Sequence, residues 1–148
     1  MQTIDTQDLA HELAVEHGAL DLDEQRAAVS LYRLLAEGAP VAPERLAERA
    51  ALPRERVIEL LARWAGVYRD RDGSVIGFWG LTIRDMPHRL EIGGRTLHAW
   101  CAWDTLFLPE ILGGRAVVTS TCPTTGATVS LEVEQNGVRR AALAGDGR

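Results

Sequence analysis

The sequence predicts an α+β fold, in which a helical N-terminal region packs on a small mixed or antiparallel sheet core with one inserted helix. Two observations lead to this prediction: apolar residues recur with a helical period up to about residue 66 and with a period of two from about residue 81. At 148 residues, the chain has the length of one ordinary domain or of two small units sharing a core. We therefore divide it into region 1–80 and a β-rich region 81–148.

Three helices are predicted in the first region. The longest begins at Asp21, where Glu24 three residues later completes a capping-box pattern, and it ends before Gly38. The next two open with Pro43 and Pro53, because proline suits the first position of a helix. The first and the third of these helices carry an apolar stripe that would be buried.

A β-hairpin is predicted over about 67–80. Asp72-Gly73 lies there between alternating apolar residues, which is a strong hairpin signal. Three helices followed by a hairpin is the order of elements in a winged helix, so region 1–80 is expected to be winged-helix-like with this hairpin as its wing. Residues 3–17 are expected to add one further amphipathic helix.

Short strands with tight turns are predicted through 81–148. Gly93-Gly94 is one such turn, and the strands alternate apolar and polar residues. One helical segment interrupts them, and it contains Pro109, which lacks the N–H that a helix interior needs. We expect a short helix over about 100–107 and a second turn beginning at Pro109.

Composition indicates a folded protein of the cytoplasm. Apolar residues make up 46% of the chain and charged residues 25%, and the basic residues are all arginine. No apolar run is long enough to cross a bilayer, and the N-terminus lacks the pattern of a signal peptide. In the cytoplasm the two cysteines would stay reduced, and no membrane partner is expected.

Binding to nucleic acid is not favoured by the charge distribution. The helix opening at Pro53 would be the recognition helix of a winged helix, and Arg54, Arg56 and Arg63 would contact DNA. However, region 1–80 holds nine arginines against fourteen acidic residues, whereas DNA binding needs a basic surface. A DNA-binding regulator therefore remains a less favoured alternative.

The stretch "HAWCAWDT" contains the best candidate for a reaction centre. On a helix over 100–107, Cys101 and Asp104 would share one face, and a helix N-terminus would lower the pKa of the thiol. Trp100, Trp103 and Phe107 would form an apolar pocket wall and raise the pKa of the carboxyl group. A thiolate beside a protonated carboxyl group is a usable catalytic pair, although such a spacing also occurs in simple packing.

The remaining candidate ligands are weaker. Cys122 lies in a Cys-Pro-x-x-Gly turn that resembles half of a zinc knuckle, but the chain has no second cysteine pair. His98, three residues before Cys101, could act on the thiol, whereas His11 and His17 have no partners at ligand spacing. Cys122 is therefore only a weak candidate for metal binding.

The segment "LHAWCAWDTLFLPEILGGRAVVTSTCPTTGATVSLEV" resembles the core of the organomercurial (alkylmercury) lyases. The shared features are the Trp-Cys-x-x-Asp-Thr centre, the helix break that follows it and the downstream Cys-x-x-x-Gly hairpin. The resemblance extends from about residue 28 to 134 and implies that 81–148 is an alkylmercury-lyase-like core behind a winged-helix-like region.

The resemblance implies protonolysis of a carbon–mercury bond, a step in mercury detoxification that yields a hydrocarbon and Hg(II). Cys101 would be the thiolate that binds mercury, and Asp104 would move the proton to carbon and help to hold the metal. Thiolates select soft mercury over harder ions. No cofactor is implied beyond external thiols, and the bound product Hg(II) would pass to low-molecular-weight thiols or to a mercuric reductase.

The cysteine count departs from the family pattern. Family members are usually longer and carry a second catalytic cysteine beyond the matched region, whereas this sequence contains Cys101 and Cys122 alone. Cys122 matches a family cysteine regarded as structural. Three interpretations stay open: a shortened chain, a divergent lyase using one thiol with Asp104 or Cys122, or a relative that binds or senses mercury without turnover.

Overall fold

A computed structural model describes residues 20–143. The predicted helix over 3–17 lies outside the described residues, as do His11 and His17. No helix among the described residues is long and apolar enough to span a membrane.

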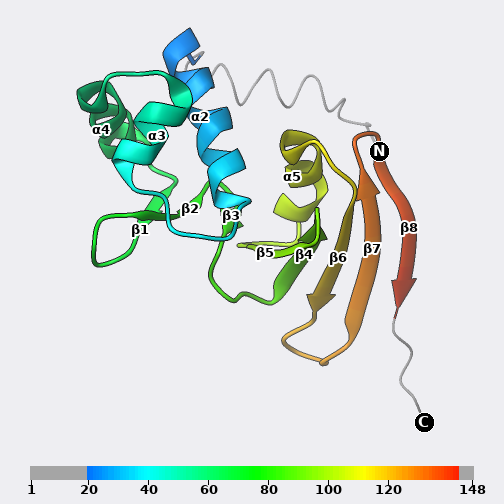
Figure 1. Ribbon diagram of the computed structural model, residues 1–148. Helices are drawn as coiled ribbons and strands as arrows, with labels where there is room; N and C mark the ends of the chain where they lie inside the picture. Colours follow the sequence, from blue (N-terminus) through cyan, green and yellow to red (C-terminus); the bar gives the residue numbers. More distant parts are fainter. Residues whose placement is uncertain (1–19, 144–148) are drawn as a thin grey trace, which may run out of the picture.

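Three helices form the N-terminal part of the structure, as predicted (Figure 1). The first keeps its predicted capping box: Asp21 Oδ1 accepts from the Glu24 N–H at 2.8 Å, and Glu24 Oε2 accepts from the Asp21 N–H at 2.7 Å. These contacts satisfy two of the N–H groups that a helix start leaves unpaired. The helices are α2 (Leu22–Leu35), α3 (Pro43–Ala50) and α4 (Arg54–Arg63).

Eight strands form a single sheet, and every strand pairing in it is antiparallel. The α+β class is therefore confirmed, and of the two expected kinds of sheet the structure has the antiparallel one. The strands are β1 (Val67–Arg69), β2 (Val75–Phe78), β3 (Leu81–Thr82), β4 (His88–Ile92), β5 (Arg95–Ala99), β6 (Ala116–Thr121), β7 (Thr128–Glu134) and β8 (Gly137–Leu143).

The strand order is β1-β2-β3-β5-β4-β6-β7-β8. The predicted hairpin over 67–80 forms from β1 and β2, and it continues into the common sheet through the pairing of β2 with β3. The β4–β5 hairpin turns at Gly93-Gly94, as expected, and lies in the middle of the sheet. It joins the strands that follow the helices to the C-terminal strands β6–β8.

The hydrophobic core lies between the helices and the sheet. Helix α2 contacts β2, β3 and α5, while α5 (Asp104–Leu112) contacts β4, β7 and β8 (Figure 1). The fully buried large side chains come from both parts of the chain, so the helices and the sheet share one core. They include Leu31, Leu35, Leu60, Phe78, Leu90, Leu97 and Leu108.

The inserted helix differs from its prediction. Helix α5 begins at Asp104 instead of at about residue 100, and it continues through Pro109 to Leu112. Pro109 is the sixth residue of this helix and lies in its interior, where the missing N–H removes one helical hydrogen bond. Because the helix begins at Asp104, Cys101 lies in the turn before it and does not lie on a helical face.

Candidate active site

Cys101 lies in the turn between β5 and α5, with Asp104 at the start of the helix. The Cys101 residue is exposed, and its N–H donates to Asp104 Oδ2 at 3.0 Å. The turn is closed by the Ala102 carbonyl, which accepts from the Thr105 N–H at 3.2 Å and from the Thr105 hydroxyl at 2.6 Å. The predicted pair is therefore brought together, through a backbone-to-carboxylate contact.

The Asp104 side chain rests against Gly80, in the turn between β2 and β3. A Cβ atom added at Gly80 would lie 2.7 Å from Asp104 Cγ and 2.8 Å from Oδ1. Such a separation is not tolerated by real side chains, so the carboxylate needs a glycine at this place. The Gly80 carbonyl also accepts from the Trp100 N–H at 3.0 Å.

The three predicted wall residues have different surroundings. Trp100 is half-buried, and its ring lies 4.4 Å from the ring of Tyr68, centroid to centroid. Phe107 is half-buried against the core. Trp103 is 62% exposed, so the expectation that its indole would be buried beside Asp104 is wrong. The later start of α5 explains the exposure, because Trp103 precedes the first helical residue and its side chain makes no capping hydrogen bond.

His98 is held away from a role on the Cys101 thiol. Its Nδ1 lies 3.1 Å from the Met86 carbonyl oxygen and 3.2 Å from the Met86 N–H, and its Nε2 lies 3.5 Å from Asp85 Oδ1. These contacts tie the buried imidazole to the connection between β3 and β4.

Cys122 lies in the turn between β6 and β7 and is half-buried. The turn is closed by two hydrogen bonds, from the Cys122 N–H to the Ala127 carbonyl and from the Gly126 N–H to the Cys122 carbonyl, each 2.8 Å long. The Thr125 hydroxyl, followed by the Thr125 and Thr124 backbone N–H groups, lowers the pKa of the Cys122 thiol to about 7.

The structure does not bring Cys122 together with Cys101 and Asp104. Within residues 20–143, no three His, Cys, Asp or Glu side chains gather closely enough to hold a metal ion. The two cysteines nevertheless follow strand ends at the same edge of the sheet, on either side of β4, because His88 of β4 is paired with both Ala99 of β5 and Ser120 of β6.

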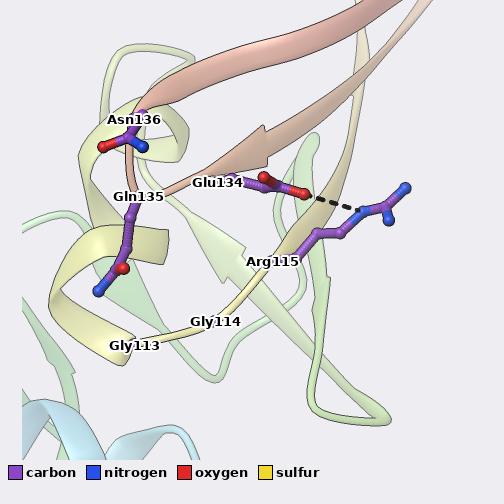
Figure 2. Close-up of a pocket in the computed structure, with 6 residues that line it drawn as sticks. All are labelled: Gly113, Gly114, Arg115, Glu134, Gln135 and Asn136. Carbon is purple, nitrogen blue, oxygen red and sulfur yellow. Dashed lines mark ion pairs between the residues drawn. The ribbon is translucent and has the colours of Figure 1, made fainter.

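A shallow hollow of about 260 Å³ lies elsewhere, between the end of α5 and the β7–β8 turn (Figure 2). Its one cationic lining residue, Arg115, lies 2.6 Å from Glu132 and 3.8 Å from Glu134. These ion pairs neutralise the hollow, and it contains none of the predicted site residues. It is lined by Gly113, Gly114, Arg115, Glu134, Gln135 and Asn136.

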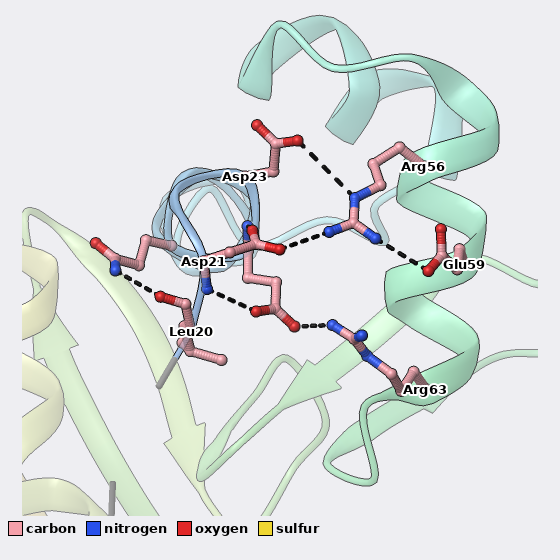
Figure 3. Close-up of polar contacts among 8 residues, drawn as sticks. Leu20, Asp21, Asp23, Arg56, Glu59 and Arg63 are labelled. Carbon is pink, nitrogen blue, oxygen red and sulfur yellow. Dashed lines mark hydrogen bonds and ion pairs between the residues drawn. The ribbon is translucent and has the colours of Figure 1, made fainter. Parts of the chain in front are cut away.

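The arginines considered for DNA contact are engaged within the protein (Figure 3). Arg56 lies 2.8 Å from Asp21 and 3.0 Å from Glu59, and Arg63 pairs with the buried Glu24. Arg54 donates to Glu44 at 2.8 Å. A phosphate would have to replace these carboxylates, and this competition supports the expectation that α4 is not a DNA-recognition helix.

Sequence reasoning missed three residues around the site. Gly80 lies against the Asp104 carboxyl group, and Trp79 is the residue before Gly80 in the chain. The buried Tyr32 of α2 donates its hydroxyl hydrogen to the Trp79 carbonyl at 2.9 Å. A glycine beside a tryptophan gave at most a weak signal of close packing. No local pattern could link Tyr32 to a turn 47 residues away.

Comparison with known proteins gives the same family over both regions. A family model described as alkylmercury lyase matches residues 81–145, and one described as the helix-turn-helix domain of alkylmercury lyase matches residues 6–79. An alkylmercury lyase of Staphylococcus epidermidis is 42% identical over 108 residues, which is 73% of this chain. The chain belongs to the alkylmercury lyase family.

Further family members show the same extent of similarity. An alkylmercury lyase of Pseudomonas putida is 41% identical over 74% of the chain, and one of Streptomyces lividans is 43% identical over 73%. The chain spans about half the length of these curated relatives, since the matches cover 50–51% of them.

The fold of the family is also found among solved structures. The mercury-bound form of MerB2 superposes with a TM-score of 0.68 and is 24% identical, covering 89% of this chain and 65% of that one. At this identity the likeness shows a shared fold.

Proposed function

We propose that this chain cleaves carbon–mercury bonds by protonolysis, with Cys101 as the thiolate that binds mercury and Asp104 as the proton donor. The observation that carries the proposal is the contact between the Cys101 N–H and Asp104 Oδ2, which holds the carboxyl group against the backbone of an exposed cysteine. Membership of the alkylmercury lyase family gives this pair its expected substrate, a small organomercurial.

The proposed reaction balances with one thiol and one proton. The Cys101 thiolate binds R–Hg⁺ and forms a sulfur–mercury bond, because mercury is a soft metal that prefers sulfur ligands. The carboxyl group of Asp104 gives its proton to carbon, and the two electrons of the carbon–mercury bond form the new C–H bond. The products are R–H and Hg(II) bound to Cys101, with Asp104 left as a carboxylate.

The contacts of its two oxygens fix the orientation of the Asp104 carboxyl group. Oδ2 is occupied by the Cys101 N–H, whereas Oδ1 lies toward Gly80. Fixing one oxygen leaves the carboxyl group in a single orientation, so the proton need not be delivered from a freely rotating group. After cleavage the carboxylate would help to hold Hg(II), as the family resemblance implies.

External thiols complete the proposed cycle. The chain offers one cysteine at the site, so two added thiols would have to remove Hg(II) and restore the Cys101 thiol with a proton. No other cofactor is proposed. The hand-off would go to low-molecular-weight thiols or to a mercuric reductase, and a reducing cytoplasm would supply the thiols and keep both cysteines free.

The deciding experiment incubates the purified chain with phenylmercury and excess cysteine, and measures benzene by gas chromatography. We expect benzene above the rate of a protein-free sample, in a stoichiometry of one benzene per Hg(II) released. Benzene at the protein-free rate would overturn the proposed activity.

A second candidate function is mercury binding without turnover. The observation that favours it is the separation of Cys122 from the Cys101–Asp104 pair, which leaves one thiolate to activate the carbon–mercury bond. A binding protein would take up one Hg(II) at Cys101 and release no benzene. Mass spectrometry of the native protein after treatment with phenylmercury separates the candidates: a lasting phenylmercury adduct indicates binding alone, and a mercury adduct without the phenyl group indicates cleavage.

A further inference from the structure

The turn under Asp104 has a backbone conformation that needs support. Trp79 has φ +23° and Gly80 has φ +86°, so two successive residues lie in the left-handed region. This conformation is costly for a residue with a large side chain. The Trp79 ring is accommodated over Gly66, where an added Cβ would lie 1.5 Å from Trp79 Cδ1, and the Trp79 N–H donates to the Gly66 carbonyl at 3.1 Å.

Helix α2 provides a further contact to this turn. The Tyr32 hydroxyl donates to the Trp79 carbonyl at 2.9 Å, and the residue is 6% exposed. The Tyr32 ring packs on Phe78, with 4.9 Å between centroids. A buried hydroxyl that donates to a backbone carbonyl fixes the position of that peptide group, because its loss would leave the carbonyl oxygen without this partner.

The next peptide group carries the contacts to the site. The Gly80 carbonyl accepts from the Trp100 N–H at 3.0 Å, directly before Cys101 in the chain. The Gly80 Cα lies against the Asp104 carboxyl group, and Asp104 Oδ2 accepts from the Cys101 N–H. A continuous series of contacts therefore leads from the Tyr32 hydroxyl through the Trp79–Gly80 turn to both predicted catalytic residues.

We propose that Tyr32 is a positioning residue for the Cys101–Asp104 site, acting through the Trp79–Gly80 turn on which Asp104 and Trp100 rest. The inference rests on the proposed function in naming the reaction that is affected, while the positioning itself is a property of the folded chain. It assigns a part in the site to the N-terminal helical region, which otherwise contributes core packing.

The electrostatics of Tyr32 agree with this arrangement. Burial raises the pKa of the Tyr32 hydroxyl, and the nearby negative charge of Asp104 raises it further. Tyr32 therefore stays protonated and remains a hydrogen-bond donor throughout the working range of pH.

The test compares Tyr32→Phe with Ser30→Ala. The first removes a single oxygen and keeps the buried ring, and the second removes another buried hydroxyl from the same helix. With phenylmercury as substrate, we expect Tyr32→Phe to lower kcat about tenfold with KM within about twofold, because misplacement of reacting groups acts on the chemical step. Ser30→Ala should leave both constants unchanged.

Nuclear magnetic resonance of the substrate-free protein supplies a readout that does not depend on turnover. Tyr32→Phe should shift the amide signals of Gly80, Trp100 and Cys101, while Ser30→Ala should not. If wild-type protein releases no benzene, the proposed function fails and these shifts still decide the inference. Unchanged site amides in Tyr32→Phe would overturn it, as would an unchanged kcat in an active protein.

A second measurement decides the case if Tyr32→Phe does not fold. In Tyr68→Phe protein, 3-fluorotyrosine would label Tyr32 alone, since the chain has two tyrosines. Asp104→Asn should shift this fluorine signal, and Glu110→Gln, at an exposed carboxylate of the same helix, should not. A Tyr32 fluorine chemical shift that is the same in wild type and in Asp104→Asn would overturn the inference.

Discussion

The two cysteine-bearing turns differ in what surrounds the sulfur atom. Both follow strands that leave the sheet at the same edge, because β5 and β6 are each antiparallel to β4. The Thr125 hydroxyl and the backbone N–H groups of Thr124 and Thr125 lower the pKa of the Cys122 thiol. Around Cys101 the defined polar contact is made by the backbone N–H, which donates to Asp104 and leaves the exposed residue open to a ligand.

This difference distinguishes a cysteine whose thiolate is stabilised, Cys122, from the proposed catalytic pair of Cys101 and Asp104. At Cys122 the donors stabilise the negative charge of the sulfur and close a tight turn, so the residue has its partners already. At Cys101 the neighbouring group is a carboxyl, which is able to carry the proton that cleavage requires. A low thiol pKa alone is therefore not the feature on which the proposed site rests.

The largest expected effect comes from removing the sulfur of Cys101, and the same change at Cys122 is its comparison. Cys101→Ser should lower benzene release from phenylmercury by more than about a thousandfold, since it removes the proposed mercury ligand. Cys122→Ser should lower it less than about threefold, because Cys122 is not gathered with the pair. Initial rates by gas chromatography check both variants. A loss of activity in Cys122→Ser equal to that in Cys101→Ser would reverse the assignment of the two turns.

The second effect concerns the carboxyl group. Asp104→Asn keeps the size of the side chain and its acceptor oxygen for the Cys101 N–H, but it removes the transferable proton. We expect benzene release to fall about a hundredfold or more, the usual worth of a general acid. Binding of one phenylmercury at Cys101 should persist, as native mass spectrometry would show. Near-normal turnover in this variant would rule out Asp104 as the proton donor.

A smaller effect is expected at the Cys122 turn. Thr125→Val removes the largest contribution to the lowered pKa, so the Cys122 pKa should rise from about 7 toward its ordinary value. Because alkylation proceeds through the thiolate, labelling of Cys122 by iodoacetamide at pH 7 should become slower, and its midpoint should move to higher pH. Thr125→Ser, which keeps the hydroxyl, is the control. Identical pH profiles for wild type and Thr125→Val would contradict the assigned cause.

The smallest expected effect concerns Trp103, whose replacement should hardly change stability. Its indole is 62% exposed, so Trp103→Ala should change the free energy of unfolding by less than about 1 kcal/mol. If the ring acts as a pocket wall for the substrate, the variant should raise KM for phenylmercury more than for methylmercury. Urea unfolding and the two KM values measure these effects, and equal KM changes for both substrates would argue against a wall at this place.

Much of the secondary structure could be predicted from local patterns. The Asp21–Glu24 capping box, the helix opening at Pro43 and the Gly93-Gly94 turn depend on neighbouring residues, and each is present in the structure. The start of α5 was predicted four residues too early. The cause lies in the Asp104 side chain, which bonds the Cys101 N–H and closes a turn where a helix had been expected.

The pair at the site could be predicted, whereas its support could not. Cys101 and Asp104 are three residues apart, so they lie close together in the observed turn as they would on the helix that was expected there. The contacts of Gly80 with Asp104 and of Tyr32 with Trp79 depend on how α2 packs on the sheet, which no sequence period records. The exposure of Trp103 likewise follows from the helix boundary and not from its apolar character.

The order of strands in the sheet has a consequence for the folding pathway. Most neighbouring strands are also neighbours along the chain, and such local pairs can form early. The pairing of β3 with β5, Leu81 with Ala99, spans a longer loop and joins the hairpin β4–β5 to the helical half. Gly80 and Trp100 flank this pairing, so the contacts around Cys101 and Asp104 are complete only once β3 and β5 are joined, and we expect them to form after the local hairpins.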